Sequence, residues 1–140
     1  MTNLRILHRE PSKGEKLVAD ILTNAGVSFE AEKSFNDEKK IQLCRFDFYI
    51  PSMNSCIEFQ GIQHMEFSPF FHKNRSDFLK AQERDRIKIS YCLAHNIDLY
   101  CIPYWEIQNL HTVEDLFNPK FLARSKFHND EVWRAHQNLR

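Results

Sequence analysis

The chain has little of what marks several protein classes. Its 140 residues include three glycines and no Cys-x-x-Cys pair. No apolar run approaches the roughly 20 residues that span a bilayer. The N-terminal segment MTNLRILHREPSKGEK lacks the continuous apolar stretch of a signal peptide. These absences argue against a zinc ribbon, a membrane protein and a secreted protein, and they predict a cytoplasmic location.

The net charge of the chain is zero, because 19 basic residues balance 19 acidic ones. A neutral chain is mild evidence against a protein that binds nucleic acid by bulk charge. The local distribution is uneven, however, with basic residues frequent from His72 to Lys88 and acids dense between Glu30 and Glu38. The pattern fits a basic face beside an acidic one, and it also fits an ordinary solvated surface.

What the chain does contain indicates one packed domain. Hydrophobic residues make up 42% of it, and phenylalanine is abundant with 12 copies. We expect a single domain over residues 1–140, with a core at about 12–104 and a C-terminal extension at about 105–140. The cysteines are isolated in apolar stretches, which predicts buried free thiols; they are Cys44, Cys56, Cys92 and Cys101.

Capping signals and periodicity predict the order of elements. Ser12 and Glu15 form a capping-box pattern that opens a helix ending near Gly26. A second, longer helix is predicted from Ser76 to His95, with Asn96 as its cap. Strands are predicted at 27–35, 43–50, 55–60 and 97–104, and short helices at 112–117 and 129–138. Strands that alternate with helices in this order indicate a mixed α/β fold.

The most informative stretch is RFDFYIPSMNSCIEFQGIQH, residues 45–64, which reads as a hairpin. If Phe46, Phe48, Ile57 and Phe59 point to the core, alternation places Asp47 and Glu58 together on the opposite face. Opposed positions across a hairpin lie about 5 Å apart at Cβ. Two carboxylates at this distance repel each other unless a cation neutralises them, and Mg²⁺ is a suitable cation. The alternative is a pair of ordinary solvent-facing acids.

The long helix adds polar groups to a face that should be buried. Its stripe toward the sheet comprises Phe78, Gln82, Asp85, Ile89 and Cys92. Buried polar side chains need partners, which would be a metal-bound water or a substrate phosphate, or else other groups of a satisfied core network. Lys88 lies one turn after Asp85, and His64 follows the second hairpin strand. Both are candidates for catalysis, and both could equally be ordinary surface side chains.

The runs FDFYIP, IEFQGIQH and QERDRIKISYCLAHNIDLYCIPY together resemble the PD-(D/E)XK nuclease superfamily. The nearest branch is the Vsr-like one of small phage and bacterial endonucleases, which includes nicking and homing enzymes. The resemblance extends from about Gly14 to Tyr104. It implies a restriction-endonuclease-like core, with a mixed β-sheet flanked by helices and a short helical C-terminal tail.

The resemblance also implies a site and an activity. Asp47 and Glu58 would bind Mg²⁺ or Mn²⁺, and Gln60 stands where the family usually has lysine. Glu15 matches an acid that often completes such sites, although its capping role is an equal alternative. Residues that would line the site are Gln82, Asp85, Lys88 and His64, and residues that would contact DNA are Arg45, Lys73, Arg75 and Arg84.

The expected activity is hydrolysis of DNA phosphodiester bonds, with DNA as partner, no membrane, and a possible homodimer. Gln60 carries no charge, so Lys88 or His64 would have to supply the one that lysine normally provides. Three alternatives remain open: an inactive binding module of the same fold, a structure-selective nuclease for junctions or flaps, and an RNA-directed nuclease.

Overall fold

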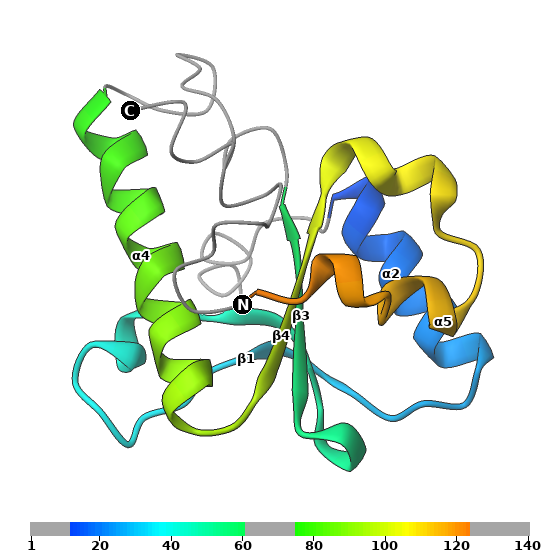
Figure 1. Cartoon of the computed structure of the whole chain (residues 1–140), viewed down its shortest axis with the longest axis horizontal. Coiled ribbons are helices and arrows are strands. Elements are labelled where there is room, and N and C mark those ends of the chain that lie inside the picture. Colours follow the sequence, from blue (N-terminus) through cyan, green and yellow to red (C-terminus); the bar gives the residue numbers. More distant parts are fainter. Residues whose placement is uncertain (1–11, 61–74, 124–140) are drawn as a thin grey trace, which may run out of the picture.

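The computed structural model describes residues 12–60 and 75–123 (Figure 1). Its first element is helix α2 (Lys13–Asn24), which begins as the sequence predicts. The backbone N–H of Glu15 donates to Ser12 Oγ at 3.1 Å, and the N–H of Ser12 donates to Glu15 Oε1 at 2.8 Å. Gly26 follows the helix with φ +74°, a left-handed conformation that glycine adopts without strain. The capping box and the glycine stop are therefore confirmed.

A four-stranded mixed sheet forms the middle of the molecule. Its strands are β1 (Glu30–Lys33), β2 (Phe46–Ile50), β3 (Ser55–Gln60) and β4 (Asp98–Pro103), and they lie side by side in that order. The β1–β2 and β2–β3 pairs are antiparallel, whereas β3 and β4 are parallel. The predicted hairpin and the predicted mixed α/β class are both confirmed.

Helix α4 (Arg75–Ala94) connects the two parallel strands. Its predicted stripe is buried in full, including the polar Gln82 and Asp85. Asn96 ends the helical segment with φ +58°, in agreement with its predicted capping role. Figure 1 shows α4 on one side of the sheet and α2 on the other.

Two apolar layers result from this arrangement. On the α4 side, Cys56 and Cys101 of the sheet pack with Ile89 and Cys92 of the helix. On the α2 side, Ile57 and Phe59 pack with helix residues such as Leu22. Every residue of β3 is consequently buried. The four cysteines are free and buried, as predicted.

Two strands differ from their predicted form. The strand expected at 27–35 is shortened to Glu30–Lys33, and Glu32 within it adopts φ +56°. The strand expected at 43–50 begins three residues later, after a 3-10 turn at Ile41–Leu43 whose Ile41 is buried. Phe46 also packs in the α4-side cluster and not with Phe48 and Ile57, so the predicted alternation is wrong at that residue.

Residues 104–121 pack mainly on the α2 side, through Leu110, Leu116 and Phe121. This segment comprises 3-10 turns at Tyr104–Asn109 and Pro119–Phe121 and the short helix α5 (Val113–Leu116), which lies within the predicted 112–117. Ala123 then donates its N–H to the Leu99 carbonyl, so the chain returns to the outer edge of β4. The helix predicted at 129–138 lies outside the described residues. Within those residues, no helix is long and apolar enough to cross a bilayer.

Candidate active site

Asp47 and Glu58 interlock across β2 and β3. The backbone N–H of Asp47 donates to Glu58 Oε2 at 2.7 Å. The backbone N–H of Phe59 donates to Asp47 Oδ2 at 2.8 Å. Each carboxylate therefore bonds an amide of the neighbouring strand, and the backbone pairing of the two strands runs from Phe48 to Ile50 beside them. The two bonds lie next to Phe46, the residue at which β2 departs from regular alternation.

Lys88 of α4 completes this arrangement from above the sheet. Its Nζ lies 2.9 Å from Glu58 Oε1, and the two side chains are 11% and 3% exposed. The same ammonium lies 5.4 Å from the centroid of the Phe46 ring. Sequence analysis left open whether Lys88 reaches the carboxylates or lies in solvent, and the contact with Glu58 decides for the first. The alternative of ordinary solvent-facing acids is likewise wrong for Glu58.

The charges of this cluster perturb one another. Removal from water raises the pKa of Asp47 well above its usual value, and the nearby charges of Glu58 and Glu15 raise it further. The Lys88 charge and the Phe59 N–H offset part of that rise. Burial lowers the pKa of Lys88, but Glu58, Asp85 and Asp47 together raise it by more, so Lys88 remains an ammonium. The acids around Lys88 thus outnumber its one ammonium group, and their repulsion contributes to the raised pKa of Asp47.

Glu15 and Asp85 contribute to this field from the two flanking helices. Glu15 is buried and accepts the capping bond from Ser12 N–H, while its charge reaches Asp47. Asp85, one turn before Lys88, is buried on the face of α4 that meets the sheet. The capping role of Glu15 and its electrostatic link to Asp47 therefore coexist.

Gln60 and Gln82 are also buried, at 2% and 1% exposure. Gln60 lies two residues after Glu58 on β3, so both side chains leave the same face of the strand. Among the described residues, Gln60 Oε1 has no hydrogen-bond partner. A buried amide oxygen without a partner costs about 1–3 kcal/mol, which makes it a candidate ligand for a cation or a water.

The donor set fits a hard divalent cation. The available atoms are carboxylate oxygens of Asp47 and Glu58 and the amide oxygen of Gln60, and Mg²⁺ and Mn²⁺ favour such oxygen ligands. A divalent ion would also relieve the repulsion that raises the pKa of Asp47. Chemically, such a site could bind a phosphate and polarise water beside a lysine.

The remaining predicted residues surround this cluster or fall elsewhere. His64 and Lys73 lie outside the described residues. Arg45, Arg75 and Arg84 are exposed, as a backbone-contacting role requires, and Arg45 forms a 3.7 Å ion pair with Glu32.

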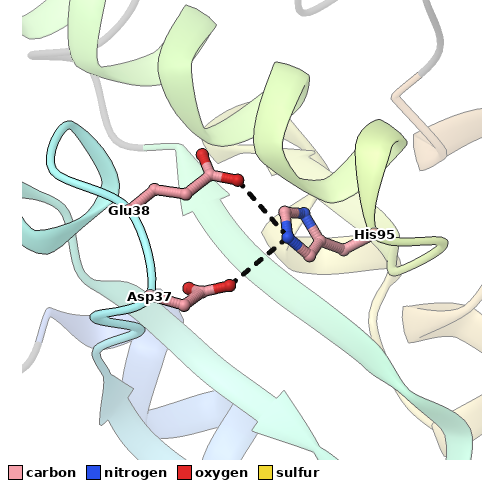
Figure 2. Close-up of side chains that lie close together, drawn as sticks. All are labelled: Asp37, Glu38 and His95. Atoms are coloured by element: carbon pink, nitrogen blue, oxygen red, sulfur yellow. Dashed lines mark ion pairs between the residues drawn. The ribbon is translucent and has the colours of Figure 1, made fainter.

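Sequence analysis missed a second polar cluster, drawn in Figure 2. It consists of Asp37 and Glu38, in the connection after β1, and His95 at the end of α4. One ligand atom from each residue lies within 4.8 Å of the others. His95 lies more than fifty positions after the two adjacent acids, so no local spacing could have revealed the cluster. Only the fold brings the three residues together.

Comparison with known proteins gives relatives but no activity. No protein-family model matches the chain. Uncharacterized protein 307L of Invertebrate iridescent virus 6 is 40% identical over 58 residues, which is 41% of this chain and 29% of that protein. Uncharacterized protein 094L of Frog virus 3 (isolate Goorha) is 35% identical over 97 residues, 66% of this chain and 63% of that protein.

A third similar protein is Uncharacterized protein 033L of Invertebrate iridescent virus 3, which is 33% identical over 58 residues. That match covers 41% of this chain and 30% of the viral protein. The chain therefore spans less than two thirds of each of these relatives.

Proposed function

We propose that the chain is a metal-dependent endonuclease that hydrolyses DNA phosphodiester bonds, with Mg²⁺ or Mn²⁺ held by Asp47 and Glu58. The observation that carries the proposal is the pairing of these carboxylates across β2 and β3, next to the ammonium of Lys88. Adjacent acids on a sheet, a lysine from the crossover helix and a neighbouring buried amide form a compact set of groups for phosphate chemistry.

The architecture supports the proposal at a second level. The order α2, antiparallel β1–β2–β3, crossover helix α4 and parallel β4 is compatible with a restriction-endonuclease-like core. We propose that the described residues form such a core, related to the Vsr-like branch. A shared fold raises the expectation of nuclease chemistry, but the site must carry the argument.

Asp47 and Glu58 would hold the ion, with Gln60 Oε1 as a further oxygen ligand. When bound, the ion would activate water and stabilise negative charge on the phosphate. The backbone amides of Asp47 and Phe59 fix the two carboxylates in orientation, so little rearrangement is needed to receive the ion.

Lys88 supplies the positive charge that Gln60 cannot. Its Nζ contacts Glu58 Oε1, and an ion bound to Glu58 would compete for that oxygen. The ammonium is then available to a phosphate oxygen beside the metal site, where it would stabilise developing charge. The exposed Arg45, Arg75 and Arg84 would contact the DNA backbone without reading sequence.

The direct test is cleavage of supercoiled plasmid by the purified chain with Mg²⁺ or Mn²⁺. We expect nicking by the wild type, because a single site cuts one strand, and linear product only where two chains act together. Asp47→Asn and Glu58→Gln keep the side-chain shape and remove the charge, so both should abolish nicking. Lys88→Ala should lower the rate at least about tenfold.

Glu106→Gln is the matched control, since Glu106 is a buried carboxylate whose partners are Asn109 and Lys120. It should cleave like the wild type. Cleavage that persists in Asp47→Asn and Glu58→Gln would refute the assigned site. Absence of cleavage by the wild type on plasmid, branched DNA and RNA would point to an inactive binding module, and activity on branched DNA or RNA alone would change the substrate.

A further inference from the structure

We propose that Asp37, Glu38 and His95 form a second metal site, specific for a divalent transition ion such as Zn²⁺. The three side chains converge from the connection after β1 and from the end of α4 (Figure 2). A histidine nitrogen with two carboxylate oxygens is a donor set that suits Zn²⁺ better than Mg²⁺, which favours oxygen ligands. This site is separate from Asp47 and Glu58 and does not depend on nuclease activity.

The distances from the histidine nitrogen to the two carboxylate oxygens fit one shared ion. His95 Nε2 lies 3.4 Å from Asp37 Oδ2 and 3.4 Å from Glu38 Oε2. Bonds of about 2.0–2.2 Å in a tetrahedral arrangement place neighbouring ligand atoms roughly 3.4 Å apart. Neighbouring ligands of an octahedral Mg²⁺ would lie closer, at about 3.0 Å. The spacing is also long for an N–H···O hydrogen bond, whose usual range is about 2.7–3.2 Å.

The tautomer of His95 is set for metal binding. Its Nδ1 lies 2.8 Å from the Tyr91 carbonyl oxygen, which can only accept a hydrogen bond. Nδ1 therefore carries the proton, and in the neutral ring Nε2 presents its lone pair toward the two carboxylates. A backbone carbonyl that orients a ligating histidine in this way is a regular feature of metal sites.

Tyr91 supports the site in two further ways. Its hydroxyl donates to Asp37 Oδ1 at 2.8 Å, which leaves Oδ2 directed at His95. Its ring stacks on the His95 imidazole with centroids 4.0 Å apart, which restricts rotation of that ring. One residue of α4 thus orients both a carboxylate and the imidazole, so an ion would find them already placed.

An ion at this position would join two separate parts of the chain. Asp37 and Glu38 precede β2, whereas His95 ends the helix that leads into β4. Binding to the folded state alone would stabilise that state by an amount that grows with the logarithm of the free zinc concentration above Kd. The inferred role of the ion is therefore structural: it would link the β1–β2 connection to α4. Asp37 and Glu38 are exposed, which leaves room for water as a further ligand.

The test is titration of the purified, chelator-stripped full chain with Zn²⁺ alone, followed by calorimetry and by thermal unfolding. We expect one zinc ion to bind at this site and Tm to rise with zinc concentration. His95→Gln and Glu38→Gln should each weaken this binding about tenfold or more and remove the rise in Tm. Tyr91→Phe, which deletes the hydroxyl on Asp37, should weaken it by about 10–100-fold.

His111→Gln is the matched control, because His111 is an exposed histidine outside the cluster; it should bind zinc like the wild type. Asp47→Asn should also keep the zinc site, which separates this proposal from the nuclease proposal. Zinc binding that is unchanged in both His95→Gln and Glu38→Gln would overturn the assignment, as would no binding by the wild type. Glu38 is 53% exposed, so its variant remains informative even if His95→Gln fails to fold.

Discussion

At the scale of single residues, the Lys88–Glu58 ion pair stabilises the fold in addition to its proposed role in catalysis. Mutation can measure the contribution to stability separately. Removal of one partner leaves the other charge buried, which typically costs about 3–5 kcal/mol. Because Glu58 is 3% exposed, we expect Lys88→Met to lower the free energy of unfolding by an amount in that range. Urea unfolding of the metal-free chain, followed by circular dichroism, measures the loss.

The double variant Lys88→Met/Glu58→Gln is the control for that prediction. With both charges gone, most of the lost stability should return, because no unpaired charge stays buried. Added Mg²⁺ should stabilise Lys88→Met more than the double variant, since only the former keeps both acids. Equal stability of Lys88→Met and the wild type would show that the ammonium does not neutralise Glu58 in solution.

The sequence predicted which residues lie side by side here but not the bonds between them. The expected closeness of Asp47 and Glu58 and the buried stripe with Gln82 and Asp85 are confirmed, whereas the alternation behind the first expectation fails at Phe46. The amide bonds that lock the two carboxylates could not be predicted, because they depend on where β2 and β3 stop pairing. The Asp37–Glu38–His95 cluster depends on tertiary contacts alone.

At the scale of elements, α2 shows how one residue can serve a helix cap and a charged site together. Glu15 accepts the Ser12 N–H through Oε1 and also raises the pKa of Asp47. Glu15→Gln keeps a carbonyl oxygen for the cap and removes the charge. We expect it to change the free energy of unfolding by less than about 0.5 kcal/mol, while it weakens Mn²⁺ binding at Asp47 and Glu58.

Ser12→Ala is the complementary variant, since it removes the hydroxyl that caps Glu15 N–H and leaves the charge in place. It should cost about 1 kcal/mol of stability and leave Mn²⁺ affinity nearly unchanged. Chemical unfolding and Mn²⁺ titration of both variants give the comparison. If Glu15→Gln destabilised the chain as Ser12→Ala does and bound Mn²⁺ like the wild type, Glu15 would be a cap alone.

The boundaries of the elements were predictable where local chemistry sets them. Ser12 and Gly26 mark the limits of α2, and the predicted strand at 55–60 matches β3 at both ends. The predictions failed at β1 and at the start of β2, where alternation continues through residues that are not extended. Glu32 has a left-handed backbone within β1, and Leu43, predicted as the first residue of the second strand, belongs to the 3-10 turn Ile41–Leu43.

At the scale of the whole molecule, the burial of β3 follows from its position between two layers and two strands. It pairs with β2 on one side and β4 on the other, and all six of its residues are buried. The outer edge of β4 is covered where Ala123 N–H bonds the Leu99 carbonyl. β1 lies at the opposite edge of the sheet, and three of its four residues are exposed. The two carboxylates thus lie on the two central strands, Asp47 on β2 and Glu58 on β3, where bonds to backbone amides hold them in a fixed geometry.

This arrangement predicts a gradient of backbone protection across the sheet. Amide protons in buried, doubly paired strands exchange through near-global unfolding, whereas edge strands exchange through local opening. We expect the slowest hydrogen exchange in Ser55–Gln60, intermediate rates in Asp98–Pro103 and the fastest in Glu30–Lys33, as measured by NMR at neutral pH. Lys88→Met should speed exchange at Phe59, whose amide bonds Asp47, before it affects β1. If the amides of β1 exchanged as slowly as those of β3, the strand order would be contradicted, because a strand at the edge of a sheet pairs on one side only.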